Sequence, residues 1–211
     1  MKQLIVVSKS TEHLADEYFK AYTKVLVSEP PNENILDKDN ISDDVIAIGG
    51  GAVIDTAKVL CSERVKAYPT TYSGASRTTH AVIWGKDKKI SVETKKPITI
   101  FGKPINNKID LPEEVEVYSK IDCLCHILEA FISPNATKLS NEYVKRARMA
   151  YLDGKYMIAS FLAGDAIEIT GTNIIHGLSY PLTYKYGIPH GKALATILHE
   201  ALNIPKVKEL L

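Results

Sequence analysis

The sequence has no long apolar run, no excess of one charge and few cysteines, and each of these absences excludes a class of protein. Its longest apolar stretches, such as Val45–Ile48 and Ala193–Leu198, fall far short of the roughly 20 residues that a membrane-spanning helix needs. Basic and acidic residues number 26 and 25, so the net charge of +1 gives no electrostatic reason to bind nucleic acid or an anionic membrane. We therefore expect neither nucleic acid nor a membrane to be the main partner.

The three cysteines, Cys61, Cys123 and Cys125, cannot all be paired in disulfides. The apolar run after Met1 is too short for the core of a secretory signal peptide, and charged residues follow it closely. Free thiols without a secretion signal are typical of a reducing compartment, so we expect a cytoplasmic protein.

The first half of the chain alternates short apolar runs with segments of helical periodicity. The expected elements are strands at Leu4–Val7, Lys24–Val27, Asp44–Ile48 and Ile98–Phe101, helices at about 11–22 and 53–61, and a hairpin with strands Ala81–Trp84 and Lys89–Val92. This alternation predicts an α/β fold, in which crossover helices connect the strands of a parallel sheet.

From Glu113 onward, the predicted elements are all helices. They cover Val117–Phe131, Glu142–Ala150, Lys155–Ala163 and Gly191–Leu202. We expect a linker over Pro104–Pro112 and two domains, an α/β domain at residues 1–112 and an α-helical domain at residues 113–211.

A run of three glycines, Gly49 to Gly51, separates the predicted strand Asp44–Ile48 from a helix. Backbone N–H groups without side chains can approach a phosphate, and the helix N-terminus adds partial positive charge. The run lacks the Gly-x-Gly-x-x-Gly spacing of the ordinary dinucleotide fingerprint. A tight turn that needs glycine for close strand–helix packing is therefore an equal alternative.

Asp122 and His126 are spaced i and i+4 on a predicted helix, so both side chains project from one face. A carboxylate and an imidazole placed there can share a metal ion, although spacing alone favours a surface pair or a helix-end contact. Glu129 lies on the same helix and is expected on its solvated face. Cys123 and Cys125 point off the Asp122 face and are expected to pack.

His176 and His190 lie in a segment rich in glycine, proline and tyrosine, and each is followed by glycine, which suits close packing around a site. Two unrelated histidines are the alternative. The chain has only six histidines, however, and His126, His176 and His190 all fall in its α-rich half. Three histidines and one aspartate would suit Fe²⁺ or Zn²⁺.

Four ordered segments resemble the iron-containing (group III) alcohol dehydrogenase family, which shares a superfamily with glycerol dehydrogenase and dehydroquinate synthase. They match its Gly-Gly-Gly-Ser-x-x-Asp-x-Ala-Lys block, with Ala52 in place of serine, its Pro-Thr-Thr loop, its Asp-x-x-x-His helix and the segment with its last two ligands. Ser-Tyr-Pro-Leu and Gly-Ile-Pro-His-Gly in the last segment make the match specific. The segments are Asp44–Lys58, Pro69–Ser76, Asp122–Ala130 and His176–Gly191.

The resemblance implies a role for each matched residue. The catalytic metal ligands, for Fe²⁺ or Zn²⁺, would be Asp122, His126, His176 and His190. The residues that bind NAD or NADP would be Gly49, Gly50, Gly51, Asp55, Lys58, Thr70 and Thr71. For Lys58, an exposed place on its helix is the alternative. Glu29, after the second strand, favours NAD through the ribose 2′-hydroxyl.

By this comparison we expect a shortened member, because the spacings from Lys58 to Pro69 and from His126 to His176 are short and the chain ends soon after the last ligand, where the family has further helices of its α-domain. Tyr180 stands where many dehydrogenases have another histidine, proposed as a proton relay. The implied function is metal-dependent, NAD(P)-linked interconversion of a small alcohol and its aldehyde or ketone. The alternatives are lyase or cyclase chemistry of the dehydroquinate synthase kind, and a non-catalytic relative that binds nucleotide or metal.

Missing terminal helices would leave apolar surface near Ile197, Leu198, Leu202 and Leu210, and we predict a homo-oligomer that covers it. Light scattering of the purified protein measures this association. A monodisperse monomer would contradict the prediction.

Overall fold

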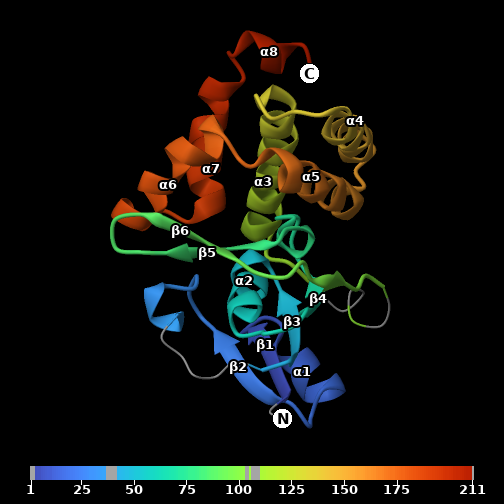
Figure 1. Cartoon of the computed structure of the whole chain (residues 1–211), viewed down its shortest axis with the longest axis vertical. Coiled ribbons are helices and arrows are strands. Elements are labelled where there is room, and N and C mark those ends of the chain that lie inside the picture. The colour runs from blue at the N-terminus through green and yellow to red at the C-terminus, as the bar shows by residue number, and fades with distance from the viewer. Residues whose placement is uncertain (1–2, 37–41, 103–104, 106–109, 211) are drawn as a thin grey trace. The chain divides into compact units, whose positions relative to one another are not determined.

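The computed structural model of the chain describes residues 3–36, 42–102, 105 and 110–210 (Figure 1). The chain divides into two compact units, with residues 1–71, 75–85 and 89–111 in unit 1 and residues 72–74, 86–88 and 112–211 in unit 2. The expected boundary at residue 112 lies beside the main division, and most of the expected linker lies outside the described residues. Among the described helices, none has the length and apolar character of a membrane span.

Unit 1 is built on a five-stranded parallel sheet in the order β2-β1-β3-β4-β7, which confirms the predicted α/β fold. The strands are β1 (Gln3–Ser8), β2 (Thr23–Val27), β3 (Asp44–Gly49), β4 (Lys66–Pro69) and β7 (Ile98–Thr99). The central strands β1 and β3 are buried on both faces, which is why their sequences are continuous apolar runs rather than alternating ones.

Two helices cover opposite faces of this sheet. α1 (Glu12–Tyr18) packs on the face that includes Val7 and Ile48, whereas α2 (Gly51–Val59) packs on the face that includes Val6 and Ala47. Because β2 and β3 lie on either side of β1, the winding of the chain reverses at β1. Sheets of this kind bind ligands beyond the carboxyl ends of the strands at such a reversal.

Several element boundaries in unit 1 differ from the predicted ones. α1 ends at Tyr18 rather than near Tyr22, because Phe19 leaves the helical conformation (φ −134°, ψ 42°) and its ring packs against Tyr22 and Tyr68. α2 starts two residues earlier than expected, at Gly51. β5 (His80–Trp84) and β6 (Lys89–Glu93) form the predicted antiparallel hairpin. Short 3₁₀ turns occupy Glu33–Ile35 and Ala75–Arg77.

Unit 2 is helical, as predicted. Its helices are α3 (Glu113–Ile132), α4 (Lys138–Leu152), α5 (Tyr156–Thr170), α6 (Ile174–Tyr186), α7 (His190–Ala201) and α8 (Pro205–Lys208). α3 is the central element, since Cys123 packs in a core with α4 and α5 while Cys125 packs in a second core with α6, α7 and α8. Both cysteines are fully buried free thiols, which confirms their predicted packing role.

Local sequence explains α4 but not α6. A capping box starts α4, in which Thr137 and Ser140 each accept the other's backbone N–H. The sequence pattern does not predict α6, because Gly177 and Pro181 both weaken a helix and Pro181 cannot donate a helical hydrogen bond. Contacts with α3, described below, offset these local preferences.

The apolar surface expected near the C-terminus lies elsewhere. The residues expected there are Ile197, Leu198, Leu202 and Leu210. They are partly buried and pack against the core that α3 shares with α6 and α7. The most exposed large apolar side chains of unit 2 include Leu139, Met149 and Leu152 of α4. The predicted location of this surface is therefore wrong, and self-association stays a prediction.

Gly191 allows α7 to approach α3 closely. A Cβ at this position would lie 2.6 Å from Tyr118 Cβ and 3.2 Å from the Tyr118 carbonyl oxygen, whereas a Cβ at Gly177 would meet no heavy atom within 4 Å. Close packing, predicted for both glycines that follow a histidine, therefore applies only to Gly191.

Replacing Gly191 with alanine is expected to destabilise the protein by about 1–3 kcal/mol, because the added methyl group overpacks the contact between two helices. Gly177→Ala is the matched control and is expected to be neutral or slightly stabilising, since alanine favours a helix. Urea unfolding of both variants measures the difference. Equal stabilities would contradict the close contact with Tyr118.

Candidate metal centre

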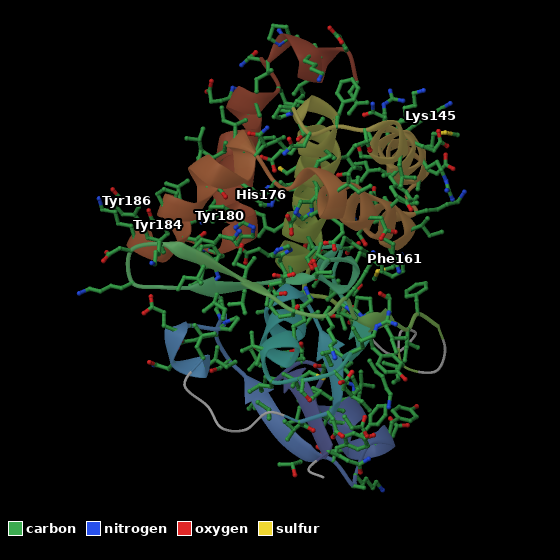
Figure 2. All side chains as sticks on the ribbon, in the orientation of Figure 1. Lys145, Phe161, His176, Tyr180, Tyr184 and Tyr186 are labelled. Carbon is green, nitrogen blue, oxygen red and sulfur yellow. The ribbon has the colours of Figure 1, made fainter. Side chains whose placement is uncertain are left out.

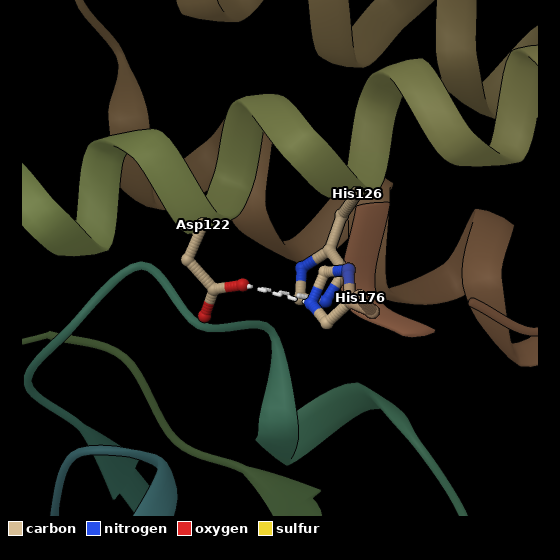
Figure 3. Close-up of side chains that lie close together, drawn as sticks. All are labelled: Asp122, His126 and His176. Carbon is tan, nitrogen blue, oxygen red and sulfur yellow. Dashed lines mark hydrogen bonds and ion pairs between the residues drawn. The ribbon is translucent and has the colours of Figure 1, made fainter. Parts of the chain in front are cut away.

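Three side chains from two helices meet inside unit 2 (Figure 3). Asp122 and His126 come from α3 and His176 comes from α6, and their potential ligand atoms all lie within 4.8 Å of one another. Asp122 Oδ1 is 3.3 Å from His176 Nε2 and 3.5 Å from His126 Nε2. The two imidazole rings stack with their centroids 4.6 Å apart. One carboxylate oxygen therefore faces both imidazoles.

Helix geometry and packing explain how α3 presents its part of this group. Asp122 and His126 lie one turn apart on one face, and Cys123 and Cys125 direct the flanking faces into separate cores. All three polar side chains of the group are buried, with exposures of 7% for Asp122, 6% for His126 and 3% for His176. Ionisable groups are this deeply buried only when they are paired or bind a metal.

His190, the fourth predicted ligand, begins α7 beside this group. Its ring centroid lies 5.3 Å from that of His176, with the planes tilted by 54°. The atoms that converge within 4.8 Å belong to the other three residues. The structure therefore brings three of the predicted ligands into one group and places the fourth next to it.

Burial and neighbouring charges set the protonation of these side chains. Burial lowers the pKa of His126 to about 4, so its imidazole is neutral at neutral pH. Burial also disfavours charge on His176, but hydrogen bonds with Asp122 and Glu129 outweigh it and raise the pKa to about 9. For Asp122, the opposing effect of the neighbouring imidazoles exceeds that of burial and lowers the pKa to about 2. An ionised carboxylate thus faces one neutral and one protonated imidazole.

Glu129 was expected on a solvated face, and this expectation is wrong because its side chain is fully buried. Its Oε1 accepts hydrogen bonds from the backbone N–H groups of Asn173 at 2.9 Å and His176 at 3.0 Å. Its Oε2 accepts a hydrogen bond from Nδ1 of His176 at 2.5 Å. The sequence did hold a signal, since Glu129 continues the i, i+4, i+7 stripe of Asp122 and His126 along one helix face.

Tyr180 lies one turn after His176 on α6, and Tyr184 and Tyr186 follow toward the other end of the helix (Figure 2). The ring centroid of Tyr180 is 6.1 Å from that of His176 and 6.0 Å from that of His190. Its hydroxyl group shares a hydrogen bond of 3.2 Å with that of Thr172. Burial raises the pKa of Tyr180 to about 12, so the phenol keeps its proton at neutral pH.

In unit 1, the glycine run and the Pro-Thr-Thr loop lie side by side at the carboxyl ends of β3 and β4. Thr70 N–H donates a hydrogen bond to the Gly49 carbonyl at 3.0 Å. A Cβ at Gly49 would lie 2.6 Å from Val53, and one at Gly50 would lie 3.0 Å from Thr71. Close packing therefore accounts for both glycines. Since Gly50 is also the N-cap of α2, no side chain caps that helix terminus.

Asp55 and Lys58 are buried in unit 1 and bind each other, so the alternative of an exposed Lys58 is wrong. Lys58 Nζ donates to Asp55 Oδ1 and Thr78 Oγ1 at 3.1 Å and to the His80 carbonyl at 2.7 Å. These three partners use all three protons of the ammonium group. Asp55 Oδ2 accepts from the Val82 N–H. The pair therefore connects α2 to β5 through hydrogen bonds. A nucleotide contact by either residue stays a prediction.

Residues 116–209 match a family model described as the Fe-containing alcohol dehydrogenase family, C-terminal. The matched segment contains the four predicted metal ligands, Asp122, His126, His176 and His190.

Curated relatives are dehydrogenases and reductases. The 4-hydroxybutyrate dehydrogenase of Clostridium kluyveri is 27% identical over 230 residues, covering 85% of this chain and 60% of the relative. The 1-propanol dehydrogenase PduQ of Salmonella typhimurium is 29% identical, covering 73% and 49%. The chain therefore spans about half to three fifths of the length of these relatives.

Solved structures of iron-containing alcohol dehydrogenases have the same fold. The enzyme from Corynebacterium glutamicum aligns with a TM-score of 0.81 at 20% identity, covering 100% of this chain and 68% of that one. The enzyme from Thermotoga maritima aligns with a TM-score of 0.77 at 23% identity, covering 100% and 75%. The chain therefore has the fold of iron-containing alcohol dehydrogenases, and its residues 116–209 are similar to the C-terminal part of that family.

Proposed function

We propose that this chain supplies a metal-dependent, NAD(P)-linked oxidoreductase activity that interconverts a small alcohol and its aldehyde or ketone. The observation that carries the proposal is the buried group of Asp122, His126 and His176, with His190 beside it. Relatives named as 4-hydroxybutyrate and 1-propanol dehydrogenases support hydride transfer rather than lyase chemistry.

The donor set fits Fe²⁺ or Zn²⁺. A carboxylate oxygen and two imidazole nitrogens converge inside a helical bundle, and imidazole with carboxylate suits both ions. A shared cation also explains why two buried imidazoles stack beside a carboxylate. When bound, the ion would act as a Lewis acid that lowers the pKa of an alcohol or polarises a carbonyl group.

The protein's own side chains prepare this site for a cation. Neutral His126 offers a nitrogen lone pair without losing a proton. Ionised Asp122 offsets part of the positive charge of the ion. His176 must first release its proton, so its affinity for a cation depends on pH.

The nucleotide is proposed to lie along the carboxyl edge of the parallel sheet in unit 1. The uncapped N-terminus of α2, at Gly50 and Gly51, suits a pyrophosphate, and Thr71 lies against Gly50. Glu29 follows β2 and lines a cavity with Thr56, where a carboxylate favours NAD by accepting a hydrogen bond from the ribose 2′-hydroxyl. NAD or NADP would supply the hydride acceptor.

The decisive experiment uses protein loaded with Fe²⁺ or Zn²⁺ and follows the absorbance of NADH or NADPH in the presence of small aldehydes. We expect cofactor oxidation by the wild type. His190→Ala is expected to lower zinc affinity at least about tenfold and to reduce turnover in parallel, because it removes a proposed ligand.

His199→Ala is the matched control, because His199 lies on the same helix and is exposed. It should bind zinc and oxidise cofactor like the wild type. Cofactor binding without oxidation by any aldehyde would refute the oxidoreductase proposal. Equal zinc affinities of the two variants would refute the role of His190.

Zinc affinity is expected to rise with pH until about pH 9, because the ion must displace the proton that Asp122 and Glu129 stabilise on His176. One displaced proton lowers the apparent affinity about tenfold for each pH unit below this pKa. Isothermal titration calorimetry in buffers of different ionisation enthalpy counts the released protons. An affinity that is constant between about pH 7 and about pH 9 would contradict the assignment of His176.

A further inference from the structure

Glu129 carries a buried charge that the proposed ligand set does not use. Its side chain is 0% exposed and comes from the middle of α3. A buried carboxylate is tolerated only when hydrogen-bond donors surround it. All its donors described above belong to the start of α6: the backbone N–H groups of Asn173 and His176, and the His176 side chain.

The first consequence concerns the start of α6. Asn173 is the N-cap residue of this helix, yet its side chain makes no capping hydrogen bond. Glu129 Oε1 instead binds two of the N–H groups that a helix N-terminus leaves without an internal partner. Its negative charge is also favourable at the positive end of the helix dipole. Glu129 therefore caps α6 from another helix and sets the register between α6 and α3.

The second consequence concerns the imidazole of His176. An ionised carboxylate can only accept hydrogen bonds, so the bond to Glu129 Oε2 keeps a proton on Nδ1. Nε2 is then the nitrogen that faces Asp122 Oδ1, at 3.3 Å. This orientation leaves Nε2 as the only nitrogen of His176 that can bind a cation.

The two histidines of the group are held in different ways. His126 shares α3 with Asp122, so the helix itself fixes their spacing. Its Nδ1 is buried with no hydrogen-bond partner in the part of the chain that the structure describes. His176 comes from a different helix and requires a contact that relates α6 to α3.

We propose that Glu129 is the positioning residue of the metal centre, with one oxygen capping α6 and the other presenting Nε2 of His176 to the ion. Capping of the helix and orientation of the ligand are thus one interaction. The proposal rests on the metal site described above and adds the residue that assembles it.

Glu129→Gln tests this dual role, because a glutamine has the same shape but only one acceptor oxygen. If that oxygen caps α6, the amide NH₂ faces His176 Nδ1 and forces the proton onto Nε2, which then cannot bind metal. If the amide is reversed, NH₂ faces the backbone N–H groups and the cap is lost. We therefore expect zinc affinity to fall about 10- to 100-fold in the folded variant.

Glu116→Gln is the matched control, since it makes the same change on α3 at a partly exposed residue that pairs with Lys120. Zinc affinity is measured by competition with a chromophoric chelator, well below the melting temperature of each variant. Circular dichroism reports the folded fraction. In the zinc-loaded wild type, nitrogen-15 NMR should show His176 protonated at Nδ1 and coordinated through Nε2, independently of any variant.

The outcomes separate the two proposals. Weaker binding by Glu129→Gln alone, together with a protonated Nδ1 in the wild type, supports the positioning role. If Glu129→Gln melts earlier but binds zinc as tightly as Glu116→Gln, the residue is merely structural and the inference falls. Coordination through Nδ1 overturns it even if Glu129→Gln does not fold. A wild type that binds neither zinc nor Fe²⁺ overturns both the inference and the proposed function.

Discussion

The carboxylate of Glu129 holds the first turn of α6 against the middle of α3, and the candidate metal centre depends on that contact. Asp122 and His126 are arranged by one helix, but His176 reaches them only if α6 starts at the right place. A helix that contains a proline and whose N-cap residue makes no side-chain capping hydrogen bond has little local reason to do so. The buried carboxylate of Glu129, which accepts hydrogen bonds from three donors at the start of α6, supplies that reason.

The same contact governs the charge balance of the buried group. Glu129 and Asp122 flank His176, and together they keep this imidazole protonated although burial opposes its charge. His126 stays neutral under the same burial. His126 therefore offers a free lone pair, Asp122 an ionised oxygen and His176 a proton that a cation can displace. This combination suits the pH-dependent binding of a divalent cation.

In unit 1, buried polar contacts likewise hold one element, the helix α2, in place. Lys58 and Asp55 connect α2 to the strand β5 that follows much later in the chain. Close packing at Gly49 and Gly50 brings the N-terminus of α2 against Thr71. These contacts hold the turn at Gly49 and Gly50 in place. The N-terminus of α2, which no side chain caps, is the part suited to binding a phosphate.

The parallel sheet, the helical second half and the spacing of Asp122 and His126 could be predicted from the sequence, because apolar periodicity and the i, i+4 relation are local properties. The helical conformation of α6 and the burial of Glu129 and Lys58 depend instead on contacts between elements that are distant in the sequence. Composition opposed each of these outcomes, since glycine and proline weaken helices and charged side chains prefer water. Their partners lie on other elements, and hydrogen bonds across elements are what a linear pattern does not contain.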